Sequence, residues 1–153
     1  MVINLLMGNK KVKEDGERYI LCNDVILIGR HLNEPKWAIV REFFEELAES
    51  GEDVSFKTIP YSDIPEADEL ALDSNRFTVV IFEDLMNAPK KIQDKISSYF
   101  SHGWHSNISP IYISQRFFSI PKTIRENANY ISLHRGGGNL SDIKGLLASI
   151  LNI

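Results

Sequence analysis

The chain has 153 residues, a hydrophobic fraction of 43% and a net charge of −4, which are typical of one globular domain with its own core. No run of about 18 apolar residues occurs, and the short N-terminal apolar run precedes its charges, so a membrane span and a signal peptide are not expected. We expect an intracellular protein with one domain, residues 1–153, in which residues 1–20 are an atypical N-terminal segment. The single cysteine, Cys22, excludes an intrachain disulfide and a cysteine-rich metal site, and we expect it to be a small buried hydrophobe.

The charge is unevenly distributed along the chain. Residues 41–73 contain 11 acids and 2 bases, a local net charge of −9. Residues 86–153 contain 8 bases and 3 acids, a net charge of +5. The C-terminal half is therefore suited to face a polyanion such as DNA, although the same bases could simply solvate helix surfaces. The whole chain is not basic enough to predict nucleic-acid binding from charge alone.

The first half of the chain alternates between strand-like and helix-like apolar patterns. The continuous apolar run DVILIG, residues 24–29, is typical of a strand buried on both faces. The next segment predicts a helix with Asn33 as its N-cap, Pro35 in the first turn and Gly51 at its end. The residues predicted to face inward are Trp37, Val40, Phe44 and Leu47. A short strand at 54–59 and an acidic loop with one or two helical turns follow.

The second half continues this alternation. The run TVVIF, residues 78–82, is the most strand-like of the chain, and APKKIQDKISSYFSHG after it predicts a helix with Ile92, Ile96, Tyr99 and Phe100 inward. Residues 108–115 predict another strand, and residues 121–127 predict a short helix that begins with proline. The remaining elements are a last strand (Asn129 to Arg135), a glycine turn (Gly136 to Asn139) and a closing helix with Ile143, Leu146, Leu147 and Ile150 inward.

About five alternations of strand and helix predict an α/β fold with an open, mostly parallel sheet of about five strands and helices on both faces. In such sheets ligands bind beyond the carboxyl ends of the strands. Polar residues follow the predicted strands, and they are Gly29-Arg30-His31, Glu83-Asp84, Ser114-Gln115-Arg116 and His134-Arg135. Acids after one strand and a Ser-Gln pair after another are similar to the working edge of a P-loop NTPase.

The segments VVIFEDLM and SYFSHGWHSNISPIYISQRFFSIPKTIRENANYISL resemble the C-terminal half of the HerA–FtsK-type genome-packaging ATPases of large DNA viruses, over residues 77–135. The run ILIGRHLNEPKW resembles the second strand of the same core more loosely. The resemblance implies that Glu83 is the Walker B acid that orders a magnesium shell through water. It implies that Asp84 is the acid that activates water beside that magnesium, and that Gln115 is the sensor glutamine.

The resemblance also implies cofactors and partners. ATP and Mg²⁺ are the expected cofactors, and Ser114, Arg125 and Asn127 are the expected nucleotide-contacting residues, although the spacing assigns no role to Arg125 or Asn127. A ring-type homo- or hetero-oligomer and DNA are the expected partners, and no membrane is expected.

The chain departs from this family in two places. The P-loop consensus G-x-x-x-x-G-K-[ST] is absent, and the nearest segment, MGNKKVK at residues 7–13, has one glycine and the wrong spacing. Without that loop the phosphates lack backbone N–H groups and a lysine. Family members commonly have Gly-Arg-His where this chain has Gly103-Trp104-His105. That arginine is a candidate trans-acting finger, which typically contributes on the order of 10³ to 10⁵ in rate.

Other residues that could carry chemistry have ordinary structural explanations. His102 and His105 have metal-compatible spacing, but their loop has no cysteine or carboxylate, so zinc is not expected. The glycines 136–138 could receive an anion, but a flexible turn explains them equally simply. The lysines of the helix after Asp84 are expected to form a solvated face, and they are Lys90, Lys91 and Lys95.

Three hypotheses follow from the sequence. The first is a degenerate or partial DNA-packaging or translocase-type ATPase domain that keeps the Walker B and sensor strands and does not hydrolyse ATP alone. The second is a non-catalytic interaction or regulatory subunit that assembles with an intact ATPase or with DNA. The third is an unrelated receiver- or flavodoxin-like α/β domain, although a lysine that receivers usually carry at a later strand end is replaced here by Gln115 and His134-Arg135.

Overall fold

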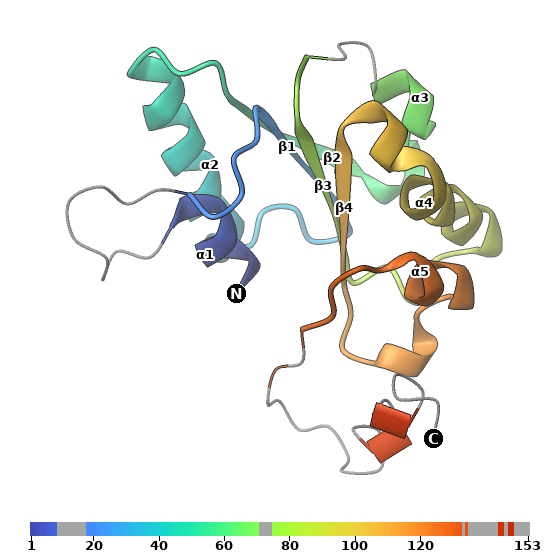
Figure 1. Cartoon of the computed structure of the whole chain (residues 1–153). Coiled ribbons are helices and arrows are strands. Elements are labelled where there is room, and N and C mark those ends of the chain that lie inside the picture. Colours follow the sequence, from blue (N-terminus) through green and yellow to red (C-terminus); the bar gives the residue numbers. More distant parts are fainter. Residues whose placement is uncertain (9–17, 71–74, 133, 135–143, 146, 149–153) are drawn as a thin grey trace.

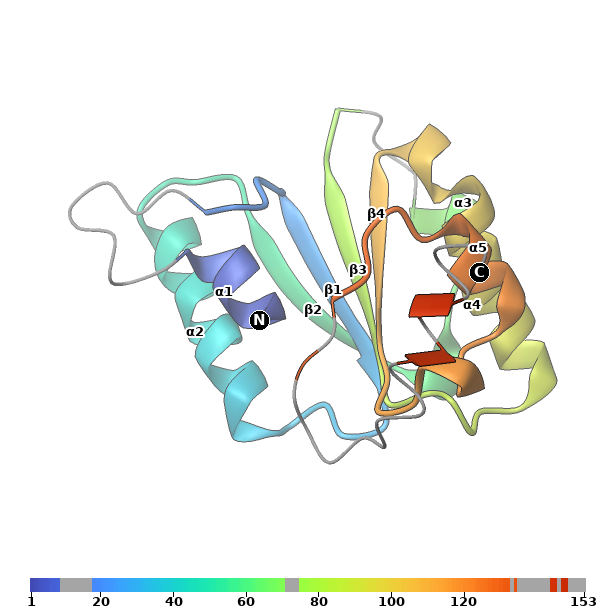
Figure 2. The ribbon, with the colours of Figure 1, turned by 60° about the horizontal axis from the view of Figure 1, so that its bottom comes forward.

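The computed structural model describes residues 1–8, 18–70, 75–132, 134, 144, 145, 147 and 148. These residues form an open sheet of four parallel strands with helices on both faces (Figures 1 and 2). The strands are β1 (Asp24–Gly29), β2 (Ser55–Pro60), β3 (Thr78–Glu83) and β4 (Ile108–Ile113). The helices are α1 (Val2–Met7), α2 (Pro35–Glu49), α3 (Ala67–Leu70), α4 (Lys90–His102) and α5 (Lys122–Asn127), with short 3₁₀ helices at Tyr61–Asp63, Gly103–Ser106 and Phe117–Ser119.

The strand order is β2-β1-β3-β4, so the direction of the connections reverses between β1 and β3. Right-handed crossovers that run in opposite directions place their helices on opposite faces of the sheet. Accordingly α1 and α2 cover one face, and α3, α4 and α5 lie on the other (Figure 2). In open α/β sheets ligands bind beyond the carboxyl ends of the strands at such a reversal, which here lies between β1 and β3.

The two central strands are buried on both faces, because their apolar side chains belong to one or the other of two cores. One core joins α1 and α2 to the sheet through Leu6, Leu27, Trp37, Phe44 and Ile81 among others. The other joins α4 and α5 to the sheet through Ile28, Phe82, Ile96, Tyr99 and Ile124 among others. Full burial of one such side chain stabilises the fold by about 1.5–3 kcal/mol. The continuous apolar runs of β1 and β3 are thus explained by helices on both sides.

Strand β4 lies at the edge of the described sheet, and its proline marks that position. The carbonyl oxygens of Asn107 and Ile113 accept hydrogen bonds from the backbone N–H groups of Thr78 and Asp84 at 3.0 and 3.2 Å. The backbone groups of successive residues in a strand point alternately to its two sides. Since Asn107 and Ile113 bond to β3, Pro110 directs its backbone groups away from β3. Proline lacks an N–H donor and is tolerated within a sheet at an outward-facing edge position of this kind.

The predicted fold class is confirmed, with corrections at particular elements. The described part of the sheet has four strands rather than about five, since Asn129 to Ser132 and His134 are not in a strand. The N-cap of α2 is Glu34 rather than Asn33, and β2 is shifted by one residue from the predicted 54–59. The short helix α1 was not predicted, and its Leu6 is fully buried. The prediction that Cys22 is a buried hydrophobe is confirmed, and burial raises the pKa of its thiol to about 11.

Two expected elements fall largely outside the described residues. The glycine turn at 136–139 lies outside them, as do Leu133 and Arg135 of the expected last strand. Of the expected closing helix, Lys144, Gly145, Leu147 and Ala148 are described, and all four have helical conformation.

A polar clamp joins the amino ends of three strands. Arg76, which precedes β3, binds both carboxylate oxygens of Asp24 on β1 at 2.7 and 2.9 Å and reaches Asp53 before β2 at 2.5 Å. The hydroxyl of Ser55 also donates to Asp24, at 2.6 Å. Bidentate arginine–carboxylate pairs fix geometry as well as adding energy, so the clamp sets the register at this end of the sheet.

The clamp predicts how stability depends on pH. The hydrogen bond from Arg76 lowers the pKa of Asp24 from its ordinary value of 3.8, so Asp24 stabilises the fold fully above that value. This contribution is lost as the pH falls below 3.8 through the lowered pKa of the folded state. In urea unfolding followed by circular dichroism, Asp24→Asn should be less stable than the wild type at neutral pH and should lose part of the acid dependence. Parallel pH profiles for the two proteins would contradict this assignment.

Candidate functional site

The carboxyl ends of β1, β3 and β4 meet at one edge, as the sequence predicts for Glu83-Asp84 and Ser114-Gln115. Gly29 of β1 and Ile113 of β4 flank Glu83 in register. A Cβ atom at Gly29 would lie only 3.2 Å from the carbonyl oxygen of Glu83, so a glycine permits the close approach of the two strand ends.

Glu83 is almost fully buried, with 8% of its surface exposed, and α2 supplies both of its partners. The ammonium of Lys36 lies 2.5 Å from one carboxylate oxygen, and the indole N–H of Trp37 donates to the other. Pro35, the first residue of α2, starts the helix at this edge and thereby places Lys36 and Trp37 over the end of β3. A buried carboxylate requires such compensation, because desolvating an unpaired charge is costly.

Lys36 also bridges to a second acid, Glu34, at 2.7 Å. Partial burial lowers the pKa of Lys36, but its hydrogen bonds to Glu34 and Glu83 outweigh this effect, so the pKa is raised. The ammonium therefore stays protonated at neutral pH and balances the charge of Glu83.

Asp84 has different neighbours from Glu83. Its φ of 52° is in the left-handed region, which turns the chain out of β3. Burial raises the pKa of Tyr112, a hydrogen bond with Gln93 lowers it, and the nearby Asp84 carboxylate raises it further. Tyr112 packs against the core beneath α4, whereas Glu83 is bound to α2 on the other face. Within the described chain, the Asp84 side chain has no hydrogen bond or ion pair.

The other predicted site residues are only partly brought to this edge. The hydroxyl of Ser114 contacts the sulfur of Met86 at 4.0 Å and accepts a hydrogen bond from the backbone N–H of Arg116. Gln115 is exposed beside it. Arg125 and Asn127 lie instead on α5, where they donate to the carbonyl oxygens of Ile120 and Thr123 at 3.1 and 2.8 Å. These two hydrogen bonds stay within residues 120–127, away from the strand ends.

The described residues do not fit a shared magnesium and ATP site. Both oxygens of Glu83 are bound, one to an ammonium and the other to an indole. Among the described residues no group of three or more His, Cys, Asp or Glu side chains could hold a metal ion. The sequence also lacks the P-loop consensus that would bind the phosphates.

Sequence reasoning missed the two residues that define this site, Lys36 and Trp37. Trp37 was predicted to lie in the core, which is correct, but a buried indole N–H needs an acceptor. Its partner Glu83 is 46 residues away in the sequence. The signal that could have pointed to the pair is a buried-looking acid at the end of an apolar strand together with a tryptophan in a first helical turn.

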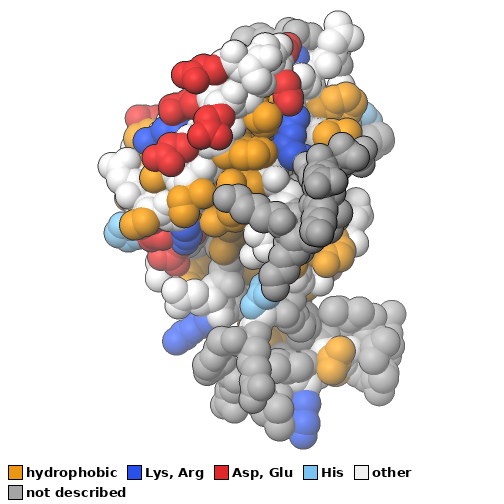
Figure 3. Space-filling view, turned by 90° about the vertical axis from the view of Figure 1, so that its left-hand side faces the viewer, with side chains coloured by type: hydrophobic (Ala, Val, Ile, Leu, Met, Phe, Trp, Pro, Cys, Tyr) orange, Lys and Arg blue, Asp and Glu red, His pale blue; other side chains and the backbone are white. Residues whose placement is uncertain are grey.

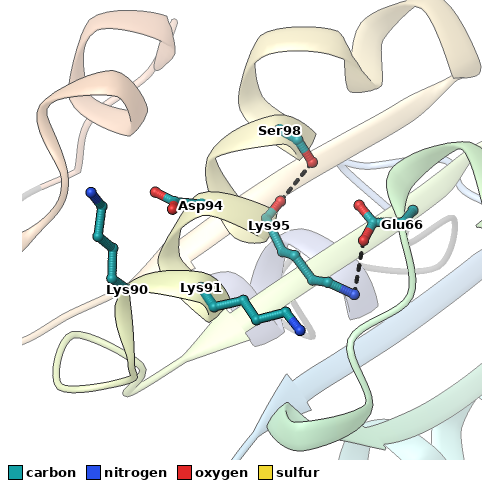
Figure 4. A pocket seen from close by; sticks show the side chains of 6 residues that line it. All are labelled: Glu66, Lys90, Lys91, Asp94, Lys95 and Ser98. Atoms are coloured by element: carbon teal, nitrogen blue, oxygen red, sulfur yellow. Dashed lines mark hydrogen bonds and ion pairs between the residues drawn. The ribbon is translucent and has the colours of Figure 1, made fainter.

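A second concentration of charge lies on α4, where an open hollow of about 600 Å³ is lined by three lysines (Figure 4). Lys95 pairs with Glu66 at 2.9 Å and donates to the carbonyl oxygen of Ile64 at 3.1 Å. Lys90 and Lys91 extend in different directions into solvent (Figure 4). The hollow is therefore a solvated helix face, as the sequence suggested. The side chain of Trp104, beyond this helix, lies outside the described part.

Comparison of the chain with models of protein families, with curated proteins and with solved structures finds no match. In the part of the chain that the structure describes, no helix has the length and apolar character needed to cross a membrane.

The contacts of Glu83 predict a structural role that mutation will reveal. Glu83→Ala leaves the Lys36 ammonium and the Trp37 indole without their buried acceptor and should lower the free energy of unfolding by about 2 kcal/mol. Glu83→Gln, which keeps an acceptor for Trp37 but not the charge, should lose less. Urea unfolding monitored by tryptophan fluorescence measures both. Unchanged stability of Glu83→Ala would refute the assignment.

The backbone conformation of Asp84 predicts which substitutions at this position the fold tolerates. Asn and Gly adopt positive φ readily, so Asp84→Asn and Asp84→Gly should leave the free energy of unfolding within about 0.5 kcal/mol of the wild type. Asp84→Val places a β-branched residue at this φ and should lower it by about 1–3 kcal/mol. A valine variant as stable as the asparagine variant would show that the backbone conformation is not constrained here.

Proposed function

We propose that this chain is a degenerate packaging-type ATPase domain that does not hydrolyse ATP by itself and acts as an assembly subunit. The observation that carries the proposal is the occupation of both Glu83 oxygens by Lys36 and Trp37. The carboxylate that the resemblance assigns to the magnesium shell is thereby used to fasten α2 to the end of β3.

The surrounding edge supports a non-hydrolytic role. The residues after β1 are Arg30 and His31, and Arg30 stacks on Tyr61 after β2 at 4.5 Å from the ring centroid. This arrangement places a cation and an aromatic ring beyond the ends of β1 and β2. A subunit with this edge would contribute its surfaces, rather than catalysis, to an assembly.

The strand order favours a second candidate, a flavodoxin-like ligand-binding domain. The order β2-β1-β3-β4 is that of the first four strands of the flavodoxin-like sheet, in which a flavin mononucleotide binds where the strand order reverses. In this chain Arg30 and His31 would be the nearest residues to the phosphate of such a ligand.

The first proposal predicts that the purified chain neither turns over ATP nor binds Mg-ATP with micromolar affinity in isothermal titration calorimetry. Lys36→Ala frees one oxygen of Glu83, yet it should not create ATP binding, because no phosphate-binding loop is restored. Light scattering after size exclusion should find an assembly larger than a monomer, alone or with a partner ATPase. Turnover by the wild type, or a strict monomer that joins no partner, would overturn the proposal. Quenching of flavin mononucleotide fluorescence by the wild type but not by Arg30→Ala would favour the second candidate instead.

A further inference from the structure

The surface beside α5 has a hollow of about 630 Å³, formed by this helix and by residues on either side of it in the chain. We call it the α5 hollow, and its lining includes Phe117, Lys122, Arg125, Glu126, Asn129 and Ile131. The volume is within the range of small-molecule sites. The lining combines charges of both signs, an amide and apolar side chains, so it suits a small ligand that carries complementary groups.

Arg125 is held in a defined orientation at this hollow. Its Nε donates to the carbonyl oxygen of Ile120 at 3.1 Å, and its guanidinium lies over the rings of Phe117 and Phe118, at 5.3 and 5.9 Å from their centroids. Among the described residues no carboxylate forms an ion pair with Arg125. Since Nε is already bound, the two terminal nitrogens of the guanidinium remain to bind a carboxylate through two parallel hydrogen bonds.

Glu126 provides the negative charge of the lining. Its side chain is 60% exposed and forms an ion pair with the ammonium of Lys122, one turn earlier in α5, at 3.3 Å. Exposed pairs of this kind contribute little energy, so the ammonium group of a ligand can share this carboxylate with Lys122 or replace it there. Because Arg125 and Glu126 are adjacent in α5 and both line the hollow, one small molecule can contact both charges.

The apolar part of the lining comes from Phe117 and Ile131. Phe117 is half-buried, and Ile131 has 36% of its surface exposed. A ligand that covers these side chains removes apolar surface from water, which is favourable. The amide of the exposed Asn129 can donate to or accept from a polar group of the same ligand.

Ligands with fewer features fit this lining less well. An inorganic anion would be attracted by Arg125 but repelled by Glu126, and it would leave the apolar side chains uncovered. A simple cation would meet the reverse problem. A molecule with a carboxylate, an ammonium group and an apolar side chain has a partner for each part of the lining.

We propose that the α5 hollow binds a free α-amino acid with a large apolar side chain. The guanidinium of Arg125 binds the α-carboxylate, the carboxylate of Glu126 binds the α-ammonium group, and the ligand's side chain covers Phe117 and Ile131. The proposal is independent of ATP binding and of the role of Glu83, because the hollow is built on α5 and not at the strand ends.

The proposal is tested by titrating the full chain with phenylalanine and following the backbone amide signals by NMR. Saturable binding is expected, with a dissociation constant of about 1 mM or lower, together with shifts of the signals of residues 125–131. N-acetylphenylalanine, which lacks the ammonium group, should bind about fivefold more weakly. Phenylalanine amide, which lacks the carboxylate, should bind at least about tenfold more weakly. No saturable binding of phenylalanine, or equal binding of either analogue, would overturn the proposal.

Two variants assign the charged contacts. Glu126→Gln keeps the size of the side chain but removes its charge, so it should weaken the binding of phenylalanine about fivefold. It should also make phenylalanine and N-acetylphenylalanine bind about equally well. Arg125→Lys keeps the positive charge but loses the paired donors, and it should weaken the binding of phenylalanine about tenfold. Circular dichroism verifies that each variant is folded.

The matched control removes a carboxylate from a distant surface. Exposed acids gather on the face of the molecule that α1 and α2 cover (Figure 3), and Glu46 of α2 is one of the exposed acids of this helix. Glu46→Gln should leave the affinity for phenylalanine within about twofold of the wild type, because α2 and α5 lie on opposite faces of the sheet. An equal loss of affinity in Glu46→Gln and Glu126→Gln would contradict a role of the α5 hollow.

Discussion

The contact of Glu83 with Lys36 and Trp37 determines how the carboxyl edge of this sheet is built. It is the point at which a buried strand, a charged residue and the start of a long helix meet, and each of the three needs the other two. The strand end requires a compensated carboxylate, the indole requires an acceptor, and α2 requires an anchor at its first turn. The Glu83 side chain is largely buried, whereas 43% of the Lys36 side chain is exposed, so the ion pair contributes modestly to net stability. Loss of its partners would leave the buried carboxylate of Glu83 uncompensated, which is costly.

This contact also distinguishes between two interpretations of one sequence pattern, in which two acids follow an apolar strand. A pair of acids after an apolar strand is compatible with metal chemistry and equally with fastening a helix. The structure gives the first acid two partners from α2 and turns the second away through a left-handed residue. Under the proposed packaging-ATPase origin both acids descend from one site, and the contacts of Glu83 show that one of them has a structural use.

The sequence predicted the sheet well because its central strands are continuous apolar runs, which only a parallel sheet covered on both faces accommodates. It failed where tertiary contacts override local pattern. Residues 129–132 have a strand-like sequence but are not in a strand, and α1 is too short to give a helical period. The partners of Glu83 could not be predicted for a related reason. Trp37 and Glu83 are 46 residues apart, so no local spacing in the sequence indicates their hydrogen bond.

Pro110 has a consequence for the behaviour of the protein in concentrated solution. The outer edge of β4 presents a row of backbone groups to its surroundings, and the proline leaves a gap in that row where a donor would be. A second extended chain that aligned there would lack one backbone hydrogen bond near the centre of the strand. The proline at this edge of the described sheet therefore also disfavours edge-to-edge aggregation.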